Sequence, residues 1–62
     1  LMWLLLAIIL NTGGVESVEI LAIVYSEKEC IEHQNHAISQ SPPENMRLGC
    51  LALKGVKNAK GL

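Results

Sequence analysis

The chain opens on an unbroken apolar run, Leu1–Leu10, which stops at the turn-forming segment Asn11–Gly14. A short apolar run between turn residues is typical of a strand that is buried on both faces. Asn and Gly tolerate positive φ, so the segment after the run favours a tight connection. We therefore predict a strand over residues 3–10 that turns directly into a second strand.

The second strand is predicted over residues 15–25, which are rich in Val and Ile. Strict alternation would place four apolar residues on one face and two polar residues on the other: Val18, Ile20, Ala22 and Val24 against Ser17 and Glu19. The two strands together predict a β-hairpin.

A helix start follows at Ser26-Glu27-Lys28-Glu29, which has the spacing of a capping box. Ser26 is expected to accept from the amide of Glu29, whose carboxylate would reach back to the Ser26 amide. Tyr25 and Cys30 occupy the two positions of a hydrophobic staple. The helix therefore begins directly after the second strand.

Residues at helical spacing then predict a narrow inward face made of Cys30, Ile31, Gln34, Ala37 and Ile38. The pair Pro42-Pro43 should end the helix, because neither ring can continue its hydrogen-bond ladder. Residues 46–53 return to strand character, and residues 54–62 form a basic tail.

These elements predict a small α+β fold, a single β-β-α-β domain over residues 1–53. The helix joins strands two and three, which should run in the same direction, and the hairpin sets strand one antiparallel to strand two. The order 2-1-3 places the fully apolar strand in the centre of a three-stranded sheet. One helix then covers one face of that sheet.

The uncovered face of the central strand is the predicted dimer or partner face, and it consists of Met2, Leu4, Leu6, Ile8 and Leu10. An apolar sheet face of this kind is an interaction surface or an aggregation hazard. Face-to-face packing of two sheets in a homodimer is the simplest way to cover it.

Residues 1–10 have a second interpretation, as a membrane anchor or a secretory signal. A membrane-spanning helix needs about 20 apolar residues, and extension of the run would place Glu16 and Glu19 inside the bilayer. A signal fits the length better, but no Lys or Arg precedes the run and no small-x-small cleavage site follows it. We favour a buried strand, with the membrane interpretation as the alternative.

Charge and aromatic content narrow the class of partner. All six glutamates lie in residues 1–46 with only one lysine, whereas residues 47–62 hold four basic residues and no acid. Trp3 and Tyr25 are the only aromatic residues, which disfavours a protein that stacks nucleic-acid bases. We expect the basic tail to be a solvated end and expect no nucleic-acid partner.

Cys30, His33, His36 and Cys50 are the only candidates for a metal site, and no pair among them has zinc-finger spacing. Nothing near either cysteine predicts an oriented base or an oxyanion hole. We therefore expect no metal, no cofactor and no enzymatic activity.

Cys30 and Cys50 make a better structural pair, because the first helical turn and strand three approach the same end of the sheet. A bridge between them would close 20 residues and stabilise by roughly 3 kcal/mol. Two buried free thiols would serve equally well in a reducing cytoplasm, so the sequence leaves both states open.

Four segments carry a family resemblance: Met2–Leu6, Thr12–Gly14, Val24–Cys30 and Leu48–Cys50. In these segments the chain resembles short proteins of unknown function encoded by tailed phages and prophages of enterobacteria. That resemblance covers most of residues 2–53 and implies a protein of the host bacterial cytoplasm.

The resemblance further implies a non-enzymatic homodimer that binds and inhibits or modulates a host protein of antiviral defence. One alternative is a membrane-associated or periplasmic small protein that uses residues 1–10 as anchor or signal. Another is an accessory protein of virion assembly.

Overall fold

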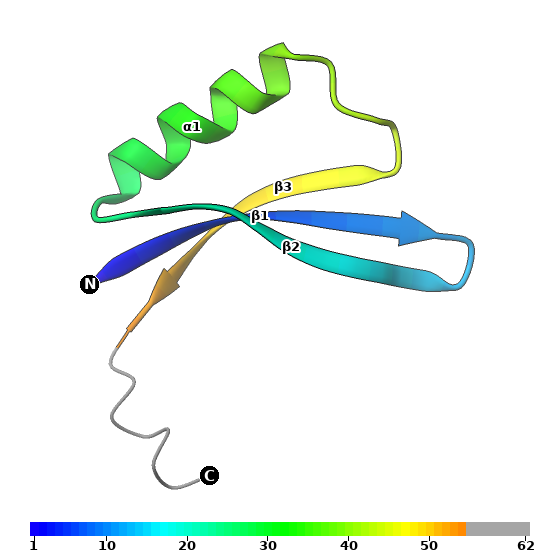
Figure 1. Ribbon diagram of the computed structural model, residues 1–62, viewed down its shortest axis with the longest axis horizontal. Coiled ribbons are helices and arrows are strands. Elements are labelled where there is room, and N and C mark those ends of the chain that lie inside the picture. Colours follow the sequence, from blue (N-terminus) through cyan, green and yellow to red (C-terminus); the bar gives the residue numbers. More distant parts are fainter. Residues whose placement is uncertain (55–62) are drawn as a thin grey trace, which may run out of the picture.

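The computed structural model describes residues 1–54 and contains three strands and one helix within them. The strands are β1 (Met2–Asn11), β2 (Gly14–Val24) and β3 (Met46–Leu53), and the helix is α1 (Glu27–Ser39). Figure 1 shows α1 lying over one face of the sheet, with the β1–β2 turn at the far end from the N-terminus. The part of the expected basic tail in residues 55–62 lies outside the described residues.

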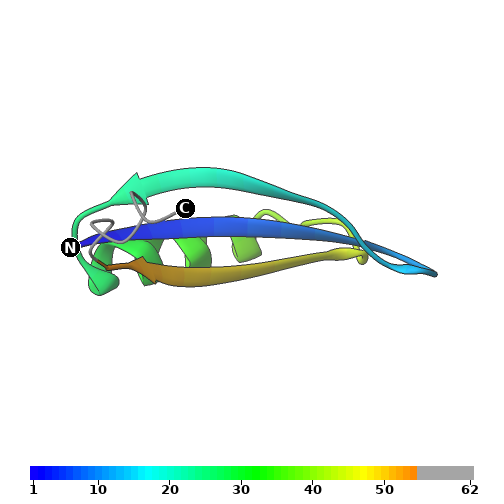
Figure 2. The same cartoon turned by 90° about the horizontal axis from the view of Figure 1, so that it is seen from below.

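The sheet has the order β2-β1-β3, with β1 antiparallel to both neighbours. The predicted α+β fold and strand order are therefore confirmed, and β2 and β3 run in the same direction (Figure 2). The most apolar strand lies in the centre, where both of its edges are paired and its side chains are shielded by a neighbouring strand on each side. Residues 2–11 form this strand and no helix.

The β1–β2 connection is tight because a side chain and a glycine both support it. The Asn11 side-chain oxygen Oδ1 accepts from the Gly13 amide at 2.7 Å, which closes a local turn. Gly14 has a φ of +125°, a conformation that L residues rarely adopt. This turn sets the start of the hairpin register, in which Asn11 pairs with Gly14.

The helix begins with half of the predicted capping box. Ser26 Oγ accepts from the Glu29 amide at 3.1 Å, as expected. The Glu29 carboxylate does not reach the Ser26 amide; its Oε1 accepts from the Ser26 hydroxyl at 3.3 Å. The predicted staple is wrong, because Tyr25 is 76% exposed while Cys30 is buried in the core.

We expect Ser26→Ala to lower the free energy of unfolding by about 1 kcal/mol, because the Glu29 amide loses its acceptor. A denaturant titration followed by circular dichroism measures this loss. Ser39→Ala is the matched control at the opposite end of the helix, where the hydroxyl donates to the His36 carbonyl. The control should keep the wild-type midpoint, and equal losses in both variants would contradict a specific capping role.

The inward face of α1 is narrower than the sequence predicts. Cys30 is buried, and Gln34 and Ala37 are half-buried, but Ile31 and Ile38 are 42% and 51% exposed. The helix lies closest to the sheet at its first turn and rises away from β1 and β2 toward its C-terminal end (Figure 1). Its packing on the sheet therefore depends mainly on the turn that contains Cys30.

The core between α1 and the sheet is small. Only Leu5, Ala7, Val24 and Cys30 are buried among residues 1–54. Partly buried Trp3, Ala22 and Cys50 pack against the cluster that Leu5, Val24 and Cys30 form. Successive side chains of a strand point to opposite faces, and Leu5 and Ala7 are buried. The odd-numbered residues of β1 therefore face the helix and the even-numbered residues face away from it.

Candidate interaction face

The sheet face away from α1, called the open face below, is aliphatic along all of β1. It contains the five residues that the sequence predicts as a partner face: Met2, Leu4, Leu6, Ile8 and Leu10. Each is half-buried by its neighbours within the sheet. In the view of Figure 2, the three strands lie in front of α1, so no described element covers this face.

Strand β2 adds four aliphatic residues to the open face through its pairing with β1: Val15, Val18, Ile20 and Ile23, which pair with Leu10, Ile8, Leu6 and Leu4. All four are between 54% and 63% exposed. The sequence missed this contribution, because regular alternation had placed Val18 and Ile20 on the same face as Ala22 and Val24.

A bulge in β2 explains the error. The register of β1 and β2 shifts between Leu5 and Leu6, so Leu21 is an extra residue with no partner in β1. One inserted residue moves every following side chain to the opposite face. Ala22 and Val24 therefore face the helix, whereas Ile20 faces away from it.

Strand β3 completes the open face with Arg47, Gly49, Leu51 and Leu53, which pair with Ile8, Leu6, Leu4 and Met2. Leu51 is 50% exposed. Gly49 lies beside the centre of β1, and a Cβ built on it would meet nothing within 4 Å. The middle of β3 is thus a shallow dip between larger side chains.

Arg47 is the one charged residue that the register of residues 1–54 places on the open face. Its Nη1 donates to the Glu44 carbonyl at 2.6 Å and to the Met46 carbonyl at 3.1 Å. These bonds hold the guanidinium at the corner where β3 begins. The centre of the open face is therefore free of charge.

The open face is large for so small a protein. Three strands at about 4.8 Å spacing and ten residues at about 3.4 Å rise cover roughly 14 Å by 34 Å, or about 480 Å² before side-chain relief is counted. Exposed apolar patches on monomeric proteins are rarely larger than a few hundred Å². The largest apolar patch of a typical monomer is about 300–600 Å² and often has a function, so the open face is a candidate binding surface.

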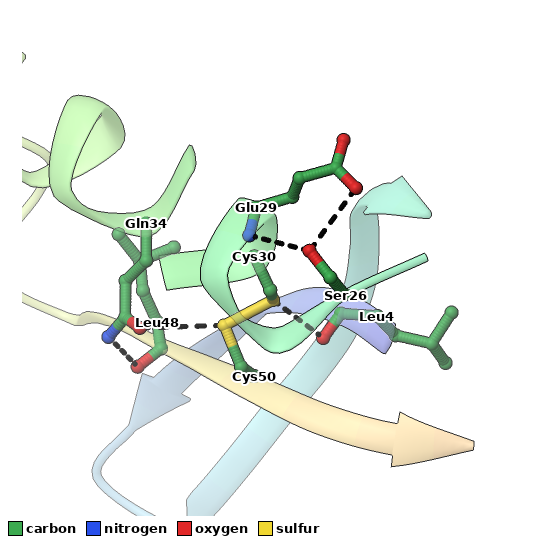
Figure 3. The surroundings of a disulfide bond; sticks show 7 residues. All are labelled: Leu4, Ser26, Glu29, Cys30, Gln34, Leu48 and Cys50. Carbon is green, nitrogen blue, oxygen red and sulfur yellow. Dashed lines mark hydrogen bonds between the residues drawn. A yellow bond between two sulfur atoms is a disulfide. The ribbon is translucent and has the colours of Figure 1, made fainter. Parts of the chain in front are cut away.

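The helix-covered face holds a disulfide between Cys30 and Cys50 (Figure 3). The sequence alone did not decide between this bridge and two free thiols. Their Cα atoms are 6.1 Å apart, within the usual range for a bridge. The Gln34 side-chain amide donates to the Leu48 carbonyl at 3.3 Å, beside the bridge. The disulfide joins the first turn of α1 to β3.

The remaining chemical candidates do not converge. His33 and His36 are exposed on α1, and both cysteine sulfurs are joined to each other. No cluster of three metal-ligating side chains and no pocket occurs within residues 1–54. In the same residues, no helix has the length and apolar character required to cross a membrane.

Comparison with known proteins returned no match to a family model, to a curated protein or to a solved structure.

Proposed function

We propose that this chain is a small non-enzymatic binding protein that acts as a homodimer through its open face. The observation that carries the proposal is the aliphatic surface built from β1, β2 and β3, with four β2 residues more than half exposed. Removal of apolar surface from water contributes about 25 cal/mol of favourable free energy per Å². Covering this surface therefore favours association. A second copy supplies an identical apolar face.

The size of the face supports a dimer. Two copies packed face to face would bury about 960 Å² of footprint, and side-chain relief raises the accessible area above that figure. A biological interface needs about 1,000 Å². A dimer would also cover the second face of the sheet, because α1 covers only the first.

The target of the dimer, in this proposal, is a host protein, which the chain inhibits or modulates. That part of the proposal rests on the resemblance to short phage and prophage proteins alone. The surfaces that a dimer leaves free are the exposed side of α1, including Ile31 and Ile38, and the two sheet edges.

A second candidate is a small extracytoplasmic protein, for example one of the bacterial periplasm. The disulfide favours this candidate over the cytoplasm, because disulfides persist in oxidising compartments and are rare where glutathione and thioredoxin keep thiols reduced. The binding role of the open face is the same in both candidates.

We expect light scattering at tens of micromolar to give twice the monomer mass for the oxidised protein. A monomer at that concentration would overturn the homodimer.

For the host target, the dimer should capture one identified protein from bacterial lysate and inhibit that protein when both are purified. Reduced protein is the control, since a chain without its bridge should capture nothing specifically.

A further inference from the structure

We propose that the two copies pack in parallel, with both β1–β2 turns at the same end of the dimer and β2 of each copy over β3 of the other. This inference rests on the homodimer proposed above and names its geometry. It follows from two features of the open face that are not symmetric: the dip at Gly49 and the charge at Arg47.

Two-fold symmetry permits two face-to-face arrangements of a three-stranded sheet. With the axis along the strands, the packing is parallel and β2 lies over β3 of the second copy. With the axis across the strands, the packing is antiparallel, the turns lie at opposite ends, and each strand lies over its own counterpart. The two arrangements bring different residues together.

Shape favours the parallel packing. Ile20 and Gly49 pair with Leu6 from opposite sides, so they lie at the same level along the sheet. Parallel packing puts Ile20, which is 57% exposed, over the dip at Gly49 of the second copy. The two-fold axis repeats this contact, so each copy fills the dip of the other. Antiparallel packing centred near Leu6 puts Gly49 over Gly49 and leaves a void, which forfeits contact energy.

Charge favours the same packing. Arg47 pairs with Ile8, at the end of the sheet that carries the β1–β2 turn. Glu16 is exposed and lies at the same end of the sheet, on β2 at the opposite edge. It has no partner in β1, because the register shifts between the pairs Ile9–Ser17 and Leu10–Val15. Parallel packing brings Arg47 of each copy toward Glu16 of the other.

Antiparallel packing separates these charges. Arg47 would then lie over β3 of the second copy near Leu51, and Glu16 would lie over β2 of the second copy beyond Val24, at the opposite end of the sheet. A charge set against aliphatic side chains loses water without gaining a partner, which is costly. Both features therefore select the arrangement with the turns together.

A distance between spin labels separates the two arrangements. A keto amino acid at Thr12, in the turn, accepts a nitroxide without adding a thiol that could disturb the disulfide. Parallel packing should give a label separation near 20 Å, whereas antiparallel packing should give about 35 Å or more, the length of the strands. A long distance would overturn the packing while leaving the dimer intact, and a monomer would overturn both.

Charge reversal gives an independent test. Arg47→Glu and Glu16→Arg should each raise the dimer dissociation constant about tenfold, because each change places like charges together at two symmetric sites. The double variant should return to within about threefold of wild type. Glu19→Arg is the matched control, because Glu19 pairs with Ala7 on the helix-covered face.

Circular dichroism should show that all four variants keep the wild-type fold. Absence of recovery in a folded double variant, or an equal loss in the Glu19→Arg control, would overturn the contact between Arg47 and Glu16.

Discussion

Reduction of the bond between Cys30 and Cys50 is expected to unfold most of the protein at temperatures where the oxidised form is folded. The bridge spans a sequence separation of 20 residues, so its loss costs about 3 kcal/mol in the loop-entropy description. Domains of this length have a total stability of only about 3–9 kcal/mol. One bond therefore accounts for a large share of the net stability.

The position of the bridge makes this loss more severe. Cys30 is the only buried residue of α1, and the helix rises away from β1 and β2 beyond its first turn (Figure 1). Without the bond, little apolar area holds the helix on the sheet. The helix-covered face, including Leu5 and Ala7, would then meet water as well.

Thermal melts followed by circular dichroism, with and without a phosphine reductant, measure this effect, with thiol state checked by mass after quenching. The double variant Cys30→Ala/Cys50→Ala should match the reduced wild type and should not respond to the reductant. A reduced wild type that melts within a few degrees of the oxidised protein would show that the helix is held by packing.

The strands and the helix start could be predicted from the sequence because each has a strong local signal. The apolar run that ends at Asn11, the Ser26–Glu29 spacing and the Pro42-Pro43 stop each depend on neighbours a few residues apart. The five even-numbered residues from Met2 to Leu10 also followed from alternation alone. Local rules were sufficient for these features.

The rest depends on contacts that no local pattern records. The bulge at Leu21 reverses the faces of β2, and it is defined only by the pairing with β1. Ile38 has helical spacing but stays exposed, because it belongs to the C-terminal end of α1, which diverges from β1 and β2. The full extent of the open face became visible only with the register.

Leu6→Lys is expected to convert the dimer to a folded monomer. Leu6 lies at the centre of the open face, between Ile20 and Gly49, and is half-buried in the single chain. A lysine there can extend into water in the monomer, but in the dimer two ammonium groups would be buried without partners. We expect the dimer dissociation constant to rise by at least about 100-fold, or roughly 3 kcal/mol.

Two control variants carry the same new side chain on the other face of the sheet. Ser17→Lys lies at an exposed position paired with Ile9 and should leave both fold and dimer unchanged. Ala7→Lys replaces a fully buried residue under α1 and should prevent folding. Light scattering and circular dichroism on the three variants separate loss of assembly from loss of structure. A Leu6→Lys protein that stays dimeric would place the interface elsewhere, because a dimer built on the open face cannot bury two unpaired lysines at its centre.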